Sequence, residues 1–201
     1  MANSFTALFD SKKMVLVVSL PNNDLEMAKA AVEGGADAIK VHANVEHFAS
    51  GKAFSSISEQ SETLQQIVQT AGVPVGLVPG ASTQALGNDL SDFIELGFSF
   101  FSIYGHHARA ELLSIPDVAK MIAIDSSYTA DQLAAVNHLP VDVLEVGIID
   151  HKGYGQLLCV QDLLKYRAIA DNVKKPILVP TQRAVKASDV PLLHEAGVSQ
   201  S

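Results

Sequence analysis

Lys40, His42 and Asn44 alternate with apolar residues in the stretch from Asp37 to His47, DAIKVHANVEH. Side chains of a β-strand point alternately to its two faces, so this spacing places the lysine, the histidine and the asparagine on one face. A lysine on a buried strand costs free energy unless it is paired or deprotonated. The row therefore predicts a functional site, whereas an edge strand with a solvated polar face is the plainer alternative.

Glu145 is the candidate partner of Lys40. In VDVLEVGII the apolar residues on either side of Glu145 form one face, which turns the carboxylate to the other face. Such a buried pair can be purely structural, each charge neutralising the other. It can also act as an acid/base pair, or tune the amine for a Schiff base with a carbonyl substrate. We expect a substrate-sized gap between Lys40 and Glu145, with His42 nearer the mouth of the cavity.

Asp125 ends the apolar run AKMIAID and is the fourth catalytic candidate, although it could equally cap the next helix or hold a turn. Together with His42 and Glu145 it offers ligands for a divalent metal. No H-x-H or H-E-x-x-H spacing supports such a site. We therefore predict no metal ligand and no cofactor, and keep a divalent metal as the alternative.

Polar residues that follow other apolar runs are candidates for substrate and phosphate binding. His106 and His107 are adjacent, so an extended backbone would direct only one of them into the site. Arg183 and Lys186 precede a predicted helix whose N-terminus would attract an anion. The predicted substrate-binding and phosphate-binding residues are Asn44, His106, Lys152, Arg183 and Lys186.

Apolar runs alternate with amphipathic helical patterns along the whole chain. The expected strands are 14–20, 37–44, 73–78, 99–105, 119–125, 141–149 and 175–181. Capping boxes at Ser56 with Glu59 and at Thr129 with Gln132 predict two helix starts. The stretches 45–55 and 151–155 follow site strands and carry glycines, so we predict mobile loops there.

This alternation predicts parallel strands with helical crossovers, as in a closed (β/α)8 barrel or an open doubly wound sheet. Units of even length, the absence of a G-x-G-x-x-G or P-loop pattern, and polar residues at several strand ends favour the barrel. Only VSQS follows Gly197. We therefore expect an α/β protein with a TIM-type barrel whose eighth strand and helix are truncated or missing. Either the chain is cut short, or a partner supplies the last strand, or the barrel is open.

Composition limits the function classes. The 201 residues are 48% hydrophobic and 18% charged, which predicts one globular domain over residues 1–201. A net charge of −8 without a basic cluster argues against a nucleic-acid partner. No apolar run of about 18 residues predicts a membrane span, and the start lacks the order of a secretory signal. Cys159 is the only cysteine, so no internal disulfide can form. We expect a cytoplasmic homo-oligomer.

The segments AVEGGADAIKV, AGVPVGLVPG and KKPILVPTQRAVKASDVPLLHEAGV resemble the phosphate-binding (β/α)8 barrels. These include the ribulose-phosphate-binding group of sugar-phosphate aldolases, epimerases and decarboxylases, and the order of the segments is similar over most of the chain. The resemblance implies the barrel fold and a phosphorylated substrate. N-acetylmannosamine-6-phosphate epimerases have a similar alternation of strands and helices. Their catalytic lysine, however, lies on the third strand, where this chain has GLVPG. The metal pattern of the pentulose-phosphate epimerases is also absent.

The residues and the resemblance together predict a lyase or isomerase that acts on a small phosphorylated carbonyl compound. Lys40 would be the amine or base, Glu145 its acid/base partner, and His42 an auxiliary proton carrier or oxyanion donor. One alternative is a metal-assisted sugar-phosphate isomerase that uses His42, Asp125 and Glu145. Another is a non-catalytic barrel that binds a metabolite or another subunit.

Overall fold

A curled sheet of seven parallel strands forms the centre of the protein. The computed structural model describes residues 3–12, 14–47, 51–84 and 90–198. The strands of the sheet follow the order β1-β2-β5-β6-β7-β8-β9, and all neighbouring strands pair in parallel. They are β1 (Val17–Ser19), β2 (Ala38–His42), β5 (Val75–Val78), β6 (Phe100–Tyr104), β7 (Ala119–Ile124), β8 (Val143–Val146) and β9 (Ile177–Leu178). Each of the seven lies within a strand that the sequence predicts.

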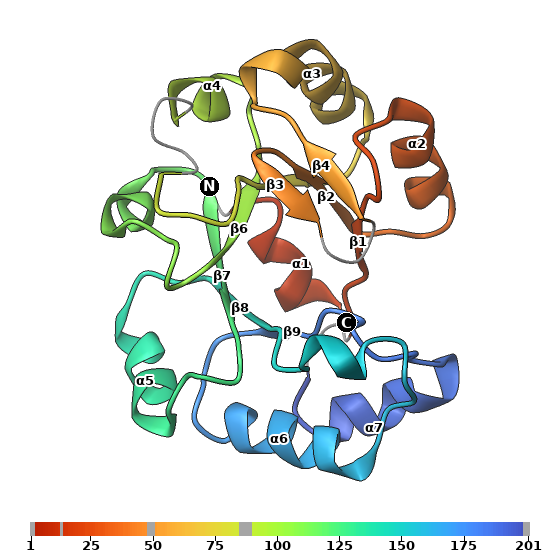
Figure 1. The fold of residues 1–201 in the computed structure, drawn as a ribbon, viewed down its shortest axis with the longest axis vertical. Coiled ribbons are helices and arrows are strands. Elements are labelled where there is room, and N and C mark those ends of the chain that lie inside the picture. The colour runs from red at the N-terminus through yellow and green to blue at the C-terminus, as the bar shows by residue number, and fades with distance from the viewer. Residues whose placement is uncertain (1–2, 13, 48–50, 85–89, 199–201) are drawn as a thin grey trace.

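Helices form a ring around the outside of this sheet (Figure 1). They are α2 (Leu25–Glu33), α3 (Ser61–Thr70), α4 (Leu90–Glu95), α5 (Ala130–Ala135), α6 (Val160–Ala170) and α7 (Val190–Glu195). Short 3-10 turns are η1 (Ser58–Gln60), η2 (Ala110–Ser114), η3 (Val136–His138), η4 (His151–Gly153) and η5 (Ala187–Asp189). The curled sheet with helices outside it confirms a TIM-type barrel arrangement and not the open doubly wound sheet. In the part of the chain that the structure describes, β1 and β9 are the two edges.

Capping side chains explain where several helices begin. The Asp24 carboxylate accepts a hydrogen bond from the backbone N–H of Met27 at the start of α2. Thr129 and Gln132 form the predicted reciprocal capping box of α5. In α3 an apolar face then buries Leu64 and Ile67 against the sheet.

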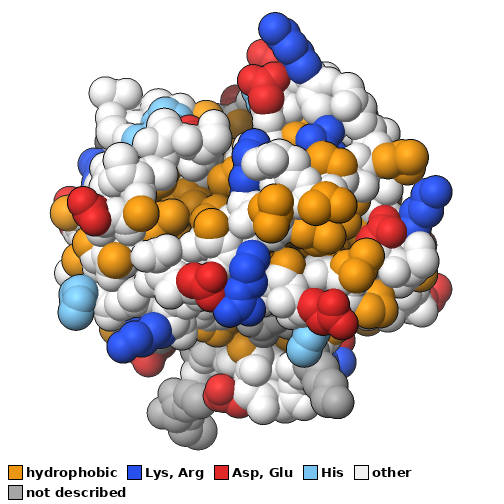
Figure 2. Space-filling view, turned by 90° about the horizontal axis from the view of Figure 1, so that it is seen from below, with side chains coloured by type: hydrophobic (Ala, Val, Ile, Leu, Met, Phe, Trp, Pro, Cys, Tyr) orange, Lys and Arg blue, Asp and Glu red, His pale blue; other side chains and the backbone are white. Residues whose placement is uncertain are grey.

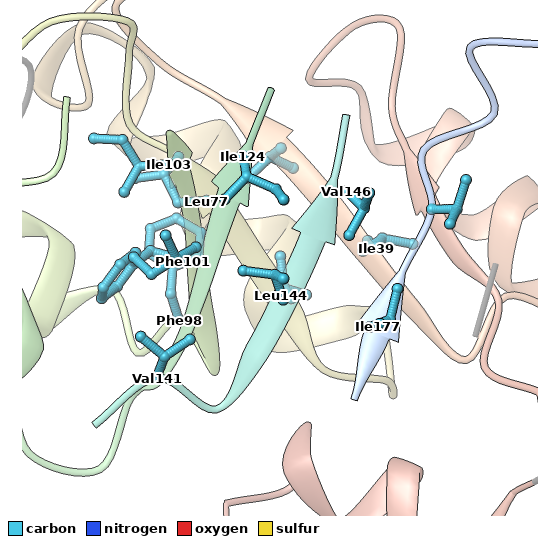
Figure 3. Packing of buried hydrophobic residues seen from close by; sticks show 14 of the residues in the cluster. Ile39, Leu77, Phe98, Phe101, Ile103, Ile124, Val141, Leu144, Val146 and Ile177 are labelled. Carbon is cyan, nitrogen blue, oxygen red and sulfur yellow. The ribbon is translucent and has the colours of Figure 1, made fainter. Parts of the chain in front are cut away.

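Alternation along the strands divides the apolar core into two layers. Residues that point outward pack against the helices, and Figure 3 shows Ile39, Leu77, Phe101, Leu144 and Val146 in this layer. A second cluster fills the inside of the barrel and contains Phe5, Ala38, Phe100, Ala119, Met121, Val143 and Leu178. Neighbours in sequence such as Phe100 and Phe101 therefore belong to opposite layers, as the period of two requires.

Helix α1 (Thr6–Ser11), which the sequence analysis missed, closes one end of the barrel (Figure 1). The Phe5 ring stacks on the Phe100 ring with 3.7 Å between centroids. The Asn3 amide donates to the carbonyl of Ser99, directly before β6, and to that of Asp117, two residues before β7 begins. The covered end is thus the one where the strands begin, and a site must use the end where they finish.

The stretch 45–55, predicted to be a mobile loop, contains paired strands in its described parts, and its mobility stays a prediction. Residues Val45–His47 (β3) and Lys52–Phe54 (β4) pair as an antiparallel hairpin, and residues 48–50 lie outside the described chain. Phe54 is 8% exposed, and its ring lies 4.8 Å from that of His42. The hairpin therefore covers the end of β2.

Apolar side chains also gather on the face that α6 and α7 present to solvent (Figure 2). The exposed large apolar residues of this part of the chain are Leu157, Val160, Leu164 and Leu192. The homo-oligomer remains a prediction. Within the described ranges, no helix is both long enough and apolar enough to cross a membrane.

Candidate functional site

Lys40 and Glu145 meet directly in the barrel interior. The Lys40 Nζ lies 2.8 Å from Glu145 Oε1, and the two side chains are 8% and 10% exposed. The Ser102 hydroxyl donates to the other carboxylate oxygen, so β2, β6 and β8 all contribute to one polar cluster. Both residues face inward as predicted, but the expected substrate-sized gap between them is wrong. The two long side chains reach each other across a narrow interior.

This contact limits the chemistry of Lys40. In the ion pair the lysine is an ammonium group, which has no lone pair to attack a carbonyl carbon. The carboxylate in turn has both oxygens occupied, one by Lys40 and one by Ser102. The arrangement therefore fits a fixed pair of charges better than a lysine poised for a Schiff base.

His42 is buried and does not lie at the mouth of a cavity. It is 1% exposed, and its Nε2 lies 3.1 Å from the Ser19 hydroxyl. The Asn23 side chain accepts from the His42 N–H and donates to the His42 carbonyl, which fixes this end of β2. The prediction that His42 lies nearer the mouth is wrong, because the β3–β4 hairpin covers it.

Asn44 does not continue the row of Lys40 and His42. Its φ of 53° lies in the left-handed region, so the alternation of β2 ends before it. The Asn44 side-chain amide lies 3.4 Å from the Pro79 carbonyl oxygen. The predicted single face of three polar residues is therefore wrong at its third member.

A cavity of about 380 Å³ lies where β6, β7, β8 and β9 end. Lys40, Glu145 and His42 are not among its lining residues. The polar side chains and the glycine that line it include Tyr104, His106, His107, Asp125, Gly147, His151, Tyr154 and Gln182. The structure thus places the predicted candidates His106 and Asp125 together, in a space separate from the Lys40–Glu145 pair.

Asp125 is held as a carboxylate beside His106. The Ser127 hydroxyl and backbone N–H both donate to Asp125 Oδ1, and these bonds lower the pKa of the carboxyl below its ordinary value. Asp125 Oδ2 lies 4.0 Å from His106 Nδ1. The distance is that of an ion pair when the imidazole is protonated, and it is too long for a hydrogen bond.

Both adjacent histidines line the cavity, although an extended backbone would have separated them. The chain turns after β6, where the His107 N–H donates to the Tyr104 carbonyl at 2.8 Å. The two imidazole centroids are 4.2 Å apart. Burial, followed by the neighbouring His106, lowers the pKa of His107.

Gln182 connects two walls of the cavity, and the sequence analysis assigned it no role. Its amide oxygen accepts from the Ile149 N–H at 3.2 Å, and its amide nitrogen donates to the Tyr154 hydroxyl at 2.7 Å. Gln182, Tyr104 and Tyr154 all follow or end apolar runs. Their polar types at strand ends were the signal that could have identified them.

Arg183 is bound by protein groups in this structure, and anion binding at Arg183 and Lys186 stays a prediction. The Arg183 guanidinium binds Asp162 through Nε at 2.9 Å and Nη2 at 3.0 Å, and donates through Nη1 to the Gly153 carbonyl. Through these hydrogen bonds Arg183, which follows β9, holds together Gly153 of η4 and Asp162 of α6. Lys186 and Lys152 are exposed and are not lining residues of the cavity.

The proposed metal ligands His42, Asp125 and Glu145 are not brought together. His42 lies under the hairpin, Glu145 binds Lys40 and Ser102, and Asp125 lines the cavity. No group of three or more histidine, cysteine, aspartate or glutamate side chains in the described ranges could hold a metal ion.

Comparison with known proteins supports the fold. No family model and no curated protein sequence matches the chain. A tryptophan synthase complex chain from Pyrococcus furiosus superposes with a TM-score of 0.71 at 12% identity, covering 94% of this chain and 85% of that one. Phosphoenolpyruvate phosphomutase from Streptomyces platensis subsp. rosaceus has a TM-score of 0.64 at 16% identity, covering 98% and 78%. The 2,3-dimethylmalate lyase of the PEP mutase/isocitrate lyase superfamily has 0.62 at 14% identity, covering 100% and 80%.

These similarities place the fold among the TIM barrels. They do not single out the ribulose-phosphate-binding group that the sequence segments resemble. At such low identity the similarity concerns the fold, and the chemistry has to be argued from the side chains.

Proposed function

We propose that the protein is a lyase or isomerase that applies acid–base chemistry to a small carbonyl compound bearing a phosphate or carboxylate group. The observation that carries this proposal is the strand-end cavity, where the His106 imidazole lies beside the Asp125 carboxylate. Parallel barrels bind their ligands at this end of the strands. A volume of about 380 Å³ suits a small metabolite.

His106 is the proton carrier in this proposal. An imidazole that gains a proton from the carbon next to a carbonyl becomes a cation, and the Asp125 anion stabilises that cation. The contact of 4.0 Å would shorten when a ligand excludes water, since hydrogen bonds of catalytic groups often tighten in the complex. Such proton transfer is common to carbon–carbon lyases and to carbonyl isomerases.

The choice of substrate class has two supports. The sequence segments described above resemble phosphate-binding barrels. The solved structures named above include a phosphoenolpyruvate phosphomutase and a 2,3-dimethylmalate lyase, whose names refer to small carboxylates. We extend these substrate classes to this chain as part of the proposal.

Lys40 has a different role here from the amine first predicted. Its ion pair with Glu145 places balanced charges inside the barrel, so no Schiff base is required. Treatment with borohydride in the presence of a carbonyl substrate should therefore leave the mass of the protein unchanged. A trapped adduct on Lys40 would favour the Schiff-base mechanism instead.

Exchange of carbon-bound protons in D2O tests the proposal without knowledge of the full substrate. We would follow pyruvate, oxaloacetate and dihydroxyacetone phosphate by proton NMR and expect exchange next to the carbonyl of at least one. His106→Gln and Asp125→Asn should slow that exchange by about 100-fold or more, the usual contribution of a positioned acid or base. His194→Gln, at an exposed position of α7, is the matched control and should exchange at the unchanged rate.

Two outcomes would contradict the proposal. One is exchange that is unaffected in both cavity variants. The other is binding of these compounds without any exchange, which would favour a non-catalytic barrel that binds a metabolite.

A further inference from the structure

We infer that the Tyr104 hydroxyl is the hydrogen-bond donor for an oxygen anion of the ligand, and that Gly147 keeps the space beside this hydroxyl open. The inference rests on the proposed function, because it assigns the residue that holds a carboxylate or phosphate oxygen in the same cavity. It assigns this role to a neutral donor that lines the cavity, in place of the charged group expected from Arg183.

The two strands bring Tyr104 and Gly147 to the same place. Ser102 and Glu145 face the barrel interior, and the alternation carries this inward face on to Tyr104 at the end of β6 and to Gly147 just after β8. A Cβ atom at Gly147 would lie only 3.0 Å from the Tyr104 hydroxyl oxygen. The glycine therefore leaves room next to the phenol that any larger residue would fill.

The Tyr104 hydroxyl has no protein partner among the described residues. Its polar neighbours are committed elsewhere, since Gln182 binds Ile149 and Tyr154, and Asp125 binds Ser127. A hydroxyl that lines a cavity without a protein acceptor is available to a ligand acceptor.

The Tyr104 phenol has the protonation state that a hydrogen-bond donor needs. Burial, and then the charge of Glu145, raise the pKa of Tyr104 to about 12. The phenol therefore keeps its proton at neutral pH. The negative charge of Glu145 would also repel a ligand anion, but Lys40 lies 2.8 Å from it and balances that charge.

Tyr104 also places the anion next to the proton carrier. Its ring stacks on the His106 imidazole with 5.3 Å between centroids and 23° between planes. A ligand oxygen at the phenol would thus lie beside the group that exchanges protons. A phenol that donates to an enolate or carboxylate oxygen stabilises the charge that develops there.

Fluorine NMR offers a direct test, because the chain has four tyrosines and no tryptophan. The intact protein labelled with 3-fluorotyrosine should give four resonances, and the variants Tyr104→Phe and Tyr166→Phe assign the two that belong to these residues. We would titrate oxalate and inorganic phosphate as probes. The Tyr104 resonance should shift and saturate with at least one probe, and that of Tyr166, a buried α6 residue, should not.

Probe binding by three variants tests the same inference. Tyr104→Phe removes only the hydroxyl and should weaken probe binding about tenfold, as the loss of a hydrogen bond to a charged group does. Gly147→Ala should weaken binding by a similar factor and move the Tyr104 resonance in the free protein. Tyr166→Phe should bind as the unchanged protein does.

The inference and the proposed function fail separately. A Tyr104 resonance that neither probe shifts, or Tyr104→Phe that binds with full affinity, would overturn the inference. Proton exchange that depends on His106 would then still support the proposed function. A saturable shift of Tyr104 without exchange in any compound would keep the binding inference and overturn the enzymatic proposal.

Discussion

Lys40 and Glu145 form an ion pair of 2.8 Å although their strands, β2 and β8, are separated by β5, β6 and β7 in the sheet. The pair exists because the sheet curls and brings its two halves face to face across the interior. Ser102 completes the coordination of the carboxylate from a third strand. These two buried charges of the barrel interior thus neutralise each other.

Breaking this pair on one side should destabilise the fold. Lys40→Met leaves the Glu145 charge buried without its partner, so we expect a loss of about 3–5 kcal/mol in the free energy of unfolding. The double variant Lys40→Met/Glu145→Met removes both charges and should recover most of this loss. Urea denaturation measures it. Lys12→Met, which breaks the more exposed pair with Asp37, is the control and should cost about 1 kcal/mol or less. Equal midpoints for Lys40→Met and the unchanged protein would contradict this account.

Gly76 on β5 should not tolerate a side chain. A Cβ atom there would lie 2.2 Å from the Phe100 ring, which is fully buried and stacked on Phe5. Gly76→Ala should lower the free energy of unfolding by about 1–3 kcal/mol or more, because the packed core leaves the Phe100 ring no space to move away from the new methyl group. Thermal unfolding measures the loss. Adding Phe100→Leu should relieve the overlap, and a double variant no more stable than Gly76→Ala would show that the ring is not the obstacle.

Arg183 should contribute to the stability of the fold. Arg183→Ala removes both hydrogen bonds from the guanidinium to the carboxylate of Asp162, a residue only 1% exposed, and should lower the melting temperature. Arg183→Lys should not restore it, since an ammonium lacks the planar fork. Arg167→Ala breaks an exposed pair with Asp171 and serves as the control. Similar melting temperatures for the two alanine variants would refute the assignment.

The same pair predicts acid sensitivity. Burial raises the pKa of Asp162, but the hydrogen bonds from Arg183 and Cys159 outweigh it and hold the pKa below the ordinary value of 3.8. A lowered pKa in the folded state stabilises the protein above the unfolded value, and this stabilisation is lost as pH falls through the folded value. In Arg183→Ala the unfolding free energy should therefore depend less on pH below about 4. An unchanged acid profile would argue against this linkage.

Alkaline pH should destabilise the protein through two buried phenols. Burial raises the pKa of both Tyr104 and Tyr166 to about 12, with Glu145 and Asp162 as the next causes. An unfolded tyrosine ionises near 10, so the stabilisation is complete below that value and is lost as pH rises toward 12. Tyr166→Phe should reduce the loss of stability between pH 10 and 12. Tyrosinate absorbance measures the ionisation, and titration of all four tyrosines near 10 in the folded protein would contradict the prediction.

Local patterns in the sequence were sufficient for the elements and for the direction of their side chains. The apolar run SFFSIYG predicts β6, and its period of two assigns Ser102 and Tyr104 to one face. The inward direction of Lys40 and Glu145 follows in the same way, because direction depends only on neighbours along the strand. Capping at Thr129 likewise depends on residues within one turn. The short helix α1 and the β3–β4 hairpin were missed because six-residue and three-residue segments carry little periodic signal.

Distances across the barrel depend on the curl of the sheet, which no local pattern specifies. Lys40 and Glu145 are 105 residues apart in the chain, and whether a gap or a contact separates them depends on how tightly the strands close. Arg183 takes Asp162 as its partner because the loop after β8 folds back over the end of β9. His106 and Asp125 share a cavity because β6 and β7 are neighbours whose ends turn toward the same side. Long-range packing therefore separated the polar residues of the strand ends into a buried ion pair and an open cavity.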